Sequence, residues 1–136
     1  MVFPCVDAFV TIASVNCENL VNFYTKLLEQ KPVTLIPNVY AEFRLTNMRL
    51  GIFKPKNTNE SEFEVISNDK LCSVYAKSKI SLCLEVSKLE DAIAHITALG
   101  YPPPGKISIA SHGREIYAYD PDGNRLILHQ AATGSH

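Results

Sequence analysis

The sequence has few of the features that mark membrane, secreted and nucleic-acid-binding proteins. No apolar run approaches the roughly 20 residues of a membrane-spanning helix, and the first residues lack the basic start and apolar core of a signal peptide. With a net charge of −1, there is no electrostatic reason to expect nucleic acid or a membrane surface as a partner. We therefore expect a cytoplasmic protein.

Paired cysteines and the common catalytic motifs are also missing. Cys5, Cys17, Cys72 and Cys83 have no paired spacing, which favours reduced thiols, and Cys83 is predicted to be buried in a strand. The sequence contains no Gly-rich phosphate loop, Ser-His-Asp arrangement or Cys-x-x-Cys pair. What it does have is 136 residues, of which 46% are hydrophobic, enough for one domain with a real core.

The clearest local pattern is a predicted β-hairpin over residues 115–129. Pro121 presets φ for its turn, Asp120 and Asp122 can accept hydrogen bonds from nearby backbone N–H groups, and Gly123 allows a positive φ. The last strand alternates, so its residues face two sides: Leu126 and Leu128 on one, and Arg125, Ile127 and His129 on the other.

The first half of the chain predicts one strand, one helix and three strands. Residues 7–14 alternate as a strand, and Asn16 is a plausible N-cap for a helix that Pro32 ends. Three short strands follow at residues 33–36, 40–45 and 49–53. The predicted order is therefore βαβββ.

The second half predicts the same order. A strand at residues 80–86 is followed by the capping box Ser87-Lys88-Leu89-Glu90 and a helix that Gly100 closes. Strands near residues 106–109 and 115–119 follow, and the last is residues 125–129. Shifting the first half by 72 residues brings Phe9 onto Ser81 and Ile12 onto Leu84, which indicates an internal duplication.

These patterns divide the single domain into two modules, about 5–54 and 79–130. The connection between them, about 55–78, is polar and charged at its start, and its later part is predicted to pack down or form a short helix. Residues 131–136 are predicted to be a frayed tail. The sequence leaves open whether Gly134-Ser135-His136 is native.

Several segments together resemble the vicinal-oxygen-chelate superfamily, which includes glyoxalase I, bleomycin-resistance proteins, fosfomycin-resistance enzymes and extradiol dioxygenases. The segments are Phe9-Val10-Thr11-Ile12, the capped helix with Phe23-Tyr24 and Leu27-Leu28, Leu84-Glu85-Val86, and Tyr117-Ala118-Tyr119-Asp120-Pro121-Asp122-Gly123-Asn124. The resemblance implies an α+β fold, in which two βαβββ modules form a curled mixed β-sheet around a cleft, with the helices outside. It also implies a homodimer, and leaves open whether modules are swapped between subunits.

Relatives in this superfamily usually hold a divalent metal in the cleft. At the four positions where the resemblance places metal ligands, this chain has Phe9, Gly51, Ser81 and Ile127. Phe, Gly and Ile offer no carboxylate or imidazole for such an ion, so we predict no metal and no other cofactor. The other histidines do not replace the ligands: His95 is predicted on the second helix, His112 in a loop and His136 in the tail, and His129 alone is predicted to point into the cleft.

The residues that remain in the implied cleft suit a small organic molecule. The predicted ligand-binding set has an apolar, aromatic part and a polar part: Phe9, Phe53, Tyr117 and Ile127, then Thr11, Arg49, Ser81, Cys83, Arg125 and His129. Tyr117 is the best single candidate, because in fosfomycin-resistance relatives the matching position faces the substrate. Glu85 and His129 are weak catalytic candidates, and Cys83 has no histidine predicted beside it.

Three functions from different classes stay open. The first is a metal-free binding protein of the bleomycin-resistance type, which sequesters an aromatic or planar ligand. The second is an enzyme, either a metal-independent lyase or isomerase, or a metal-dependent lyase or dioxygenase if the ligand positions are misaligned. The third is a structural dimer module without ligand. The missing metal ligands disfavour the second, and the aromatic and polar lining disfavours the third; the sequence does not identify the ligand.

Overall fold

The computed structural model describes residues 4–55 and 80–132, and it divides into two units, Met1–Glu64 and Val65–His136. The helix predicted within the connection, Cys72 and residues 133–136 lie outside the described residues. Within the described part, no helix is both long and apolar enough to cross a membrane.

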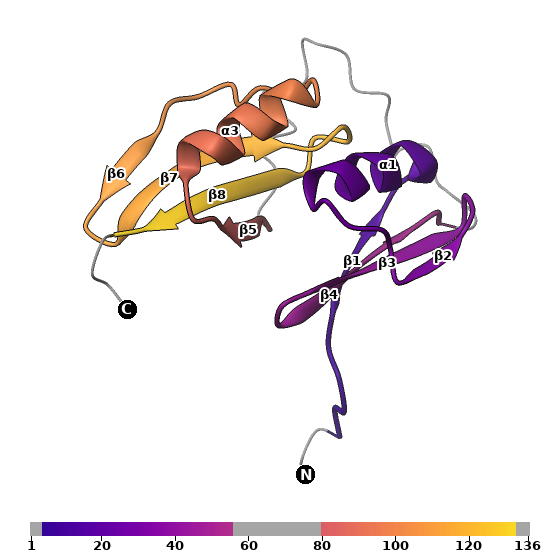
Figure 1. Ribbon diagram of the computed structural model, residues 1–136. Helices are drawn as coiled ribbons and strands as arrows, with labels where there is room; N and C mark the ends of the chain where they lie inside the picture. The colour runs from indigo at the N-terminus through magenta and orange to yellow at the C-terminus, as the bar shows by residue number, and fades with distance from the viewer. Residues whose placement is uncertain (1–3, 56–79, 133–136) are drawn as a thin grey trace. The chain divides into compact units, whose positions relative to one another are not determined.

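The first unit contains a βαβββ arrangement. Its elements are β1 (Val10–Ala13), α1 (Cys17–Leu27), β2 (Thr34–Ile36), β3 (Tyr40–Leu45) and β4 (Met48–Phe53). The strands form one sheet in the order β1-β4-β3-β2, with β1 parallel to β4 and the other neighbours antiparallel (Figure 1). The predicted order of elements is confirmed in this unit.

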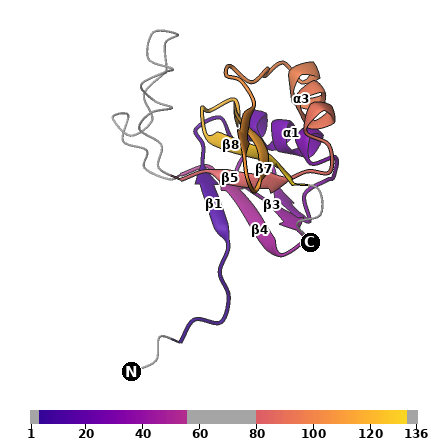
Figure 2. The same ribbon diagram turned by 90° about the vertical axis from the view of Figure 1, so that its left-hand side faces the viewer.

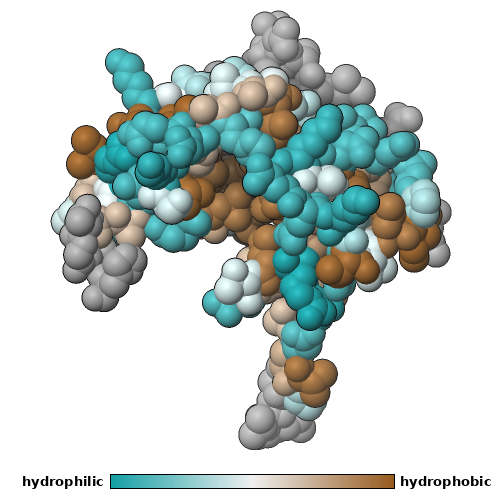
Figure 3. Space-filling model, viewed as in Figure 1, coloured by the Kyte–Doolittle hydropathy of each residue, from teal (hydrophilic) through white to brown (hydrophobic). Residues whose placement is uncertain are grey.

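Helix α1 covers one face of this sheet. Leu20 and Tyr24 on the helix are fully buried, and the Tyr24 ring lies 6.5 Å from the ring of Phe43 on β3. The opposite side of α1 is hydrophilic, as the space-filling view shows (Figure 3). This amphipathic pattern explains why the segment is helical, since burying one apolar stripe stabilises a short helix that would not persist alone.

The predicted N-cap of α1 is confirmed, but the helix does not end where it was predicted to end. Asn16 is the N-cap residue, but its side chain makes no capping hydrogen bond; instead its backbone N–H donates to Ser14 Oγ at 3.1 Å. The helix ends at Leu27, well before Pro32, and Glu29 just beyond it has a φ of 52°. A residue in the left-handed region cannot continue a right-handed helix, so the chain turns before the proline is reached.

The second unit repeats the arrangement. Its elements are β5 (Leu82–Glu85), α3 (Leu89–Ala98), β6 (Ser108–Ala110), β7 (Gly113–Tyr119) and β8 (Arg125–Ala131). The sheet order is β5-β8-β7-β6, with β5 parallel to β8 (Figure 1). Figure 2 shows β5, β7 and β8 of this sheet, together with α3, from another side. Within residues 4–55 and 80–132 there are two mixed sheets and the helices α1 and α3, which confirms the predicted α+β fold class. Ala131, predicted in the tail, belongs to β8 and pairs with Gly113.

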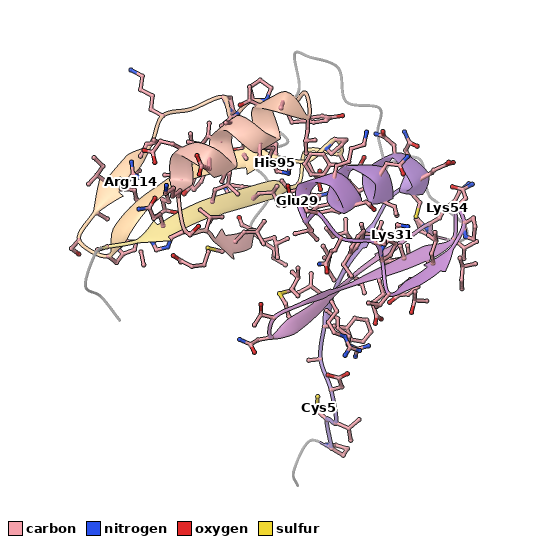
Figure 4. All side chains as sticks on the ribbon, in the orientation of Figure 1. Cys5, Glu29, Lys31, Lys54, His95 and Arg114 are labelled. Atoms are coloured by element: carbon pink, nitrogen blue, oxygen red, sulfur yellow. The ribbon has the colours of Figure 1, made fainter. Side chains whose placement is uncertain are left out.

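The start of α3 is held by distant residues rather than by the predicted capping box. The N-cap is Lys88, without a side-chain capping bond, and the first helical N–H, of Leu89, donates to Gln130 Oε1 on β8 at 2.7 Å. Arg114 on β7 points toward this end of the helix (Figure 4) and donates to the same oxygen at 2.9 Å. It also forms two hydrogen bonds to the carboxylate of Glu90, at 2.6 and 2.9 Å.

The Glu90–Arg114 pair predicts a pH-dependent contribution to stability. Hydrogen bonding from Arg114 lowers the pKa of Glu90 from 4.5 to about 2. A carboxyl group with a lowered folded-state pKa stabilises the fold above its unfolded value, so this contribution is present above pH 4.5 and is lost as the pH falls towards 2. We expect Glu90→Gln to flatten the pH dependence of unfolding in that range, measured by urea denaturation. An unchanged slope would contradict the role of this pair.

Each sheet has one face packed against the helix of its own unit and an opposite face, here called the far face. Strand alternation assigns the faces, since buried and more exposed residues alternate along β3, β7 and β8. The helix-packed residues are Ala41, Phe43, Leu50 and Ile52 in the first unit, and Ile116, Ala118, Leu126 and Leu128 in the second.

Candidate functional site

The residues that the sequence predicted for a ligand site lie on the far faces of the two sheets. The far face of the first unit carries Phe9, Thr11, Arg49 and Phe53, and that of the second carries Ser81, Cys83, Glu85, Tyr117, Arg125, Ile127 and His129. The structure thus brings each predicted set together on one sheet. That these residues bind a ligand stays a prediction, as does the cleft.

Arg49 is the centre of the far face in the first unit. Its guanidinium lies 4.3 Å from the centroid of the Phe9 ring, forms an ion pair with Asp7, and donates to Glu42 Oε1 at 3.3 Å. The hydroxyl of Tyr40 donates to the same Glu42 oxygen at 2.9 Å. Two carboxylates therefore neutralise Arg49 and fix it over the aromatic ring.

The side chain of Tyr40 closes the space beside Gly51. A Cβ atom at Gly51 would lie 3.0 Å from the Tyr40 hydroxyl oxygen and 3.2 Å from Thr11 Cγ2. Burial, followed by the hydrogen bond to Glu42, raises the pKa of Tyr40, so the phenol stays protonated. The space beside Gly51, one of the four positions where the sequence resemblance implies a metal ligand, is therefore filled by a neutral ring from the neighbouring strand.

The far face of the second unit is organised in rows across three strands. Strand register places Glu85, His129 and Glu115 side by side in one row, on β5, β8 and β7. Cys83 and Ile127 belong to the next row with Tyr117, which is 47% exposed. Rows two residues apart are about 7 Å apart along the strands, so an exposed aromatic ring lies close to the row of ionisable groups.

Glu85 and His129 form a hydrogen-bonded pair. Oε1 of Glu85 lies 2.6 Å from Nδ1 of His129, and the backbone N–H of Ala131 donates to the other carboxylate oxygen at 2.7 Å. The ring of His112, from the turn between β6 and β7, lies parallel to the His129 ring at 5.3 Å. His112 Nε2 is in turn 3.7 Å from Glu115. The two weak catalytic candidates are therefore in direct contact.

Cys83 corrects one prediction. It lies in strand β5 as expected, but it is exposed rather than buried, because it belongs to the far face and not to the helix-packed face. Partial desolvation, with the nearby carboxylates of Glu115 and Glu85, raises the pKa of its thiol. A raised pKa reduces the thiolate fraction at neutral pH, so the site does not favour Cys83 as a nucleophile.

Arg125 occupies in β8 the place that Arg49 occupies in β4, two residues before Ile127 and Gly51 respectively. Its Nε donates to Ser81 Oγ at 2.6 Å, and its guanidinium lies 5.2 Å from the centroid of the Tyr117 ring. Each unit therefore places an arginine against a partly exposed aromatic ring. The two arginines are at equivalent positions, but the rings are not: Phe9 directly precedes β1, whereas Tyr117 lies on β7. All four residues were predicted from the sequence as ligand-binding residues. Which arginine lies against which ring could not be predicted, because it depends on strand register.

The residues at the implied metal positions do not fit a divalent ion. Phe9, Gly51 and Ile127 provide no ligand atom, and the hydroxyl of Ser81 already accepts a hydrogen bond from Arg125. No cluster of three or more His, Cys, Asp or Glu suitable for a metal occurs in the described ranges 4–55 and 80–132. We therefore assign these residues no step that uses a metal.

A hollow of about 240 Å³ lies beside Tyr117 within the second unit. It is lined by Gly105, Lys106, Ser108, Glu115, Ile116 and Tyr117. The sequence prediction missed Lys106, Glu115 and His112 as neighbours of the site. Alternation along the strand at residues 115–119 places Glu115 on the face of Tyr117 and was the available signal for it, whereas the positions of Lys106 and His112 depend on loop geometry.

Comparison with solved structures identifies the fold. A bleomycin-binding protein complexed with bleomycin matches with a TM-score of 0.60 and 16% identity, over 94% of this chain and 100% of that one. A lactoylglutathione lyase from Agrobacterium tumefaciens matches with a TM-score of 0.64 and 13% identity, over 98% and 100%. A glyoxalase/bleomycin resistance protein from Albidiferax ferrireducens matches with a TM-score of 0.65 and 18% identity, over 94% and 100%.

The chain has the glyoxalase/bleomycin-resistance fold. These matches bear out the fold that the sequence resemblance implies, and at 13–18% identity they show the fold alone. No family model matches the sequence, and no curated protein matches it. Because one fold can support several reactions as well as pure binding, the function has to be argued from the site residues themselves.

Proposed function

We propose that the protein binds and sequesters a small planar organic molecule on the far faces of its sheets, without a metal ion. The observation that carries the proposal is the repeated arginine–aromatic pair. Phe9 is 45% exposed with Arg49 against its ring, and Tyr117 is 47% exposed with Arg125 against its ring. An exposed aromatic ring held by a neighbouring cation offers a stacking surface that costs little conformational entropy on binding.

Two further observations support the proposal. The hollow beside Tyr117 combines apolar contacts with the polar groups of Lys106 and Glu115, the mixture typical of small-molecule sites. One of the structural neighbours, the bleomycin-binding protein, was solved with bleomycin bound. The homodimer implied by the sequence resemblance stays part of the proposal.

The test is a thermal-shift screen of planar aromatic compounds, followed by calorimetric titration of the best ligand. We expect Tyr117→Ala to weaken its binding roughly 3- to 10-fold, the effect of losing one stacked ring. Phe9→Ala tests the other unit in the same way.

The matched control is Ile109→Ala. Ile109 is an exposed apolar residue on β6, on the opposite face of the sheet from Tyr117, so its replacement should leave the affinity unchanged. Failure of every compound to bind, or equal affinity in all variants, would refute the proposal.

A further inference from the structure

Building on the proposed function, we infer that the Glu85–His129 pair accepts a proton from the ligand, and that the ligand is a planar compound with an acidic hydroxyl group of the phenol class. These two residues belong to a cluster on the far face of the second unit. It comprises His129 on β8, Glu85 on β5, Glu115 on β7 and His112 in the turn between β6 and β7.

The carboxylate of Glu85 determines which nitrogen of His129 is free to accept a hydrogen bond. A carboxylate only accepts, so the contact of 2.6 Å places the ring hydrogen on Nδ1. The N–H of Ala131 holds the second carboxylate oxygen at 2.7 Å, which keeps the pair aligned. In the neutral imidazole, Nε2 is then left as the lone-pair acceptor.

This acceptor has no partner among the residues that the structure describes. Nε2 of His129 is buried, while the whole side chain is 15% exposed. A buried polar atom without a hydrogen bond costs free energy, and most such atoms in folded proteins are paired with protein or water. The His112 ring that lies parallel to it comes from a turn, and the His112 side chain is 63% exposed, so it can move aside for a ligand. A ligand that donates a hydrogen bond to Nε2 would satisfy it.

The charged residues around His129 limit which kind of ligand can donate a hydrogen bond to Nε2. Glu85 and Glu115 lie on either side of His129 in the same row, whereas the cations Arg125 and Lys106 lie nearer Tyr117. An ionised carboxylate placed at Nε2 itself would be repelled by these two glutamates and has no proton to donate. Glu85 already holds Nδ1–H of the ring at 2.6 Å, so this hydrogen bond stays in place when Nε2 gains a proton. A phenol fits both conditions, because it approaches as a neutral molecule and carries a proton that imidazole can take.

The neighbouring row suits the ring of such a ligand. Tyr117 and Ile127 lie two residues along β7 and β8 from Glu115 and His129. A spacing of about 7 Å between these rows leaves room for an aromatic ring beside Tyr117 whose hydroxyl points toward the row of His129. When the proton moves, the ligand O–H bond breaks and its electron pair stays on the phenolate oxygen, while the new N–H bond forms at Nε2. Glu85 holds the resulting imidazolium through Nδ1–H.

The experiment compares 4-nitrophenol with its methyl ether, 4-nitroanisole, on the full chain. At a pH where free 4-nitrophenol is mainly neutral, the bound probe should show the absorbance of the phenolate. It should also bind about 10-fold more tightly than 4-nitroanisole, the effect of one hydrogen bond to a group that becomes charged. His129→Gln keeps a polar side chain but cannot take the proton, so it should abolish the absorbance change and the preference.

Two further variants make the result decisive. Glu85→Gln should reduce the phenolate absorbance even if His129→Gln does not fold, and His95→Gln, in α3, should behave as wild type. Equal binding of both probes would overturn the inference while leaving the proposed function intact. Binding of neither probe would overturn the inference and count against the proposed function. A phenolate signal that survives in both His129→Gln and Glu85→Gln would also overturn the inference.

Discussion

Replacing Gly113 by alanine is expected to lower the free energy of unfolding by about 3 kcal/mol, from backbone strain together with overpacking. Gly113 has a φ of 142°, a conformation that side chains rarely adopt. A Cβ atom there would lie 2.2 Å from the carbonyl oxygen of Gln130 and 3.1 Å from Ala131 Cα. Both are backbone atoms of β8 and cannot swing aside, so β7 and β8 would have to separate at this point.

The measurement is urea denaturation of Gly113→Ala beside Gly105→Ala. A Cβ at Gly105 meets nothing within 4 Å, so that variant should stay within about 0.5 kcal/mol of wild type. Gly113 directly follows His112, and the strained variant should also disturb the stacking of His112 on His129. A loss below about 1 kcal/mol in Gly113→Ala would show that the β7–β8 contact is looser than described.

Replacing Asp120 by alanine is expected to cost about 3 kcal/mol, because this buried carboxylate organises the turn between β7 and β8. Its Oδ1 accepts hydrogen bonds from the backbone N–H groups of Asp122 and Asn124, each at 2.9 Å, and its Oδ2 accepts one from Asn124 Nδ2 at 2.8 Å. Alanine leaves these donors without their partner. The hairpin that positions Tyr117 and Arg125 should therefore loosen.

Asp120→Asn is the matched control for this prediction. Its amide oxygen can still accept from both backbone N–H groups, so the expected loss is smaller, about 1 kcal/mol. Chemical denaturation measures both variants, and amide hydrogen exchange should show faster opening of the hairpin in Asp120→Ala. Equal stability of the alanine and asparagine variants would mean that the carboxylate does not hold the turn.

The order of elements was predictable because its signals are local. Alternation marks strands, spacing of three and four residues marks helices, and the Asp-Pro-Asp-Gly turn marks the hairpin, where Gly123 has the expected positive φ of 85°. The shift of 72 residues carries Val10 to Leu82 and Cys17 to Leu89, the first residues of matching elements. Beyond the helices this shift no longer holds, because the segment before β6 is longer than the segment before β2.

The contacts within the site were less predictable because they depend on partners far apart in the sequence. The helix cap that Gln130 provides for Leu89 spans 41 residues, and the Glu85–His129 pair spans 44. A capping box is a local sequence pattern, and the capping box predicted at residues 87–90 was wrong. The N–H of Leu89 is instead bound by the side chain of Gln130, which comes from β8. The exposure of Cys83 likewise follows from which face of the sheet it occupies, and not from its residue type.

The central claim is that the far faces of the sheets bind a planar small molecule. The most direct measurement is an NMR titration of the full chain, isotopically labelled, with the best ligand from the screen. The account predicts saturable shifts of the amide signals of Cys83, Tyr117 and Ile127, with little change at Leu89 and Ile96 on α3. Shifts confined to the helices, or no saturable shifts at all, would contradict it.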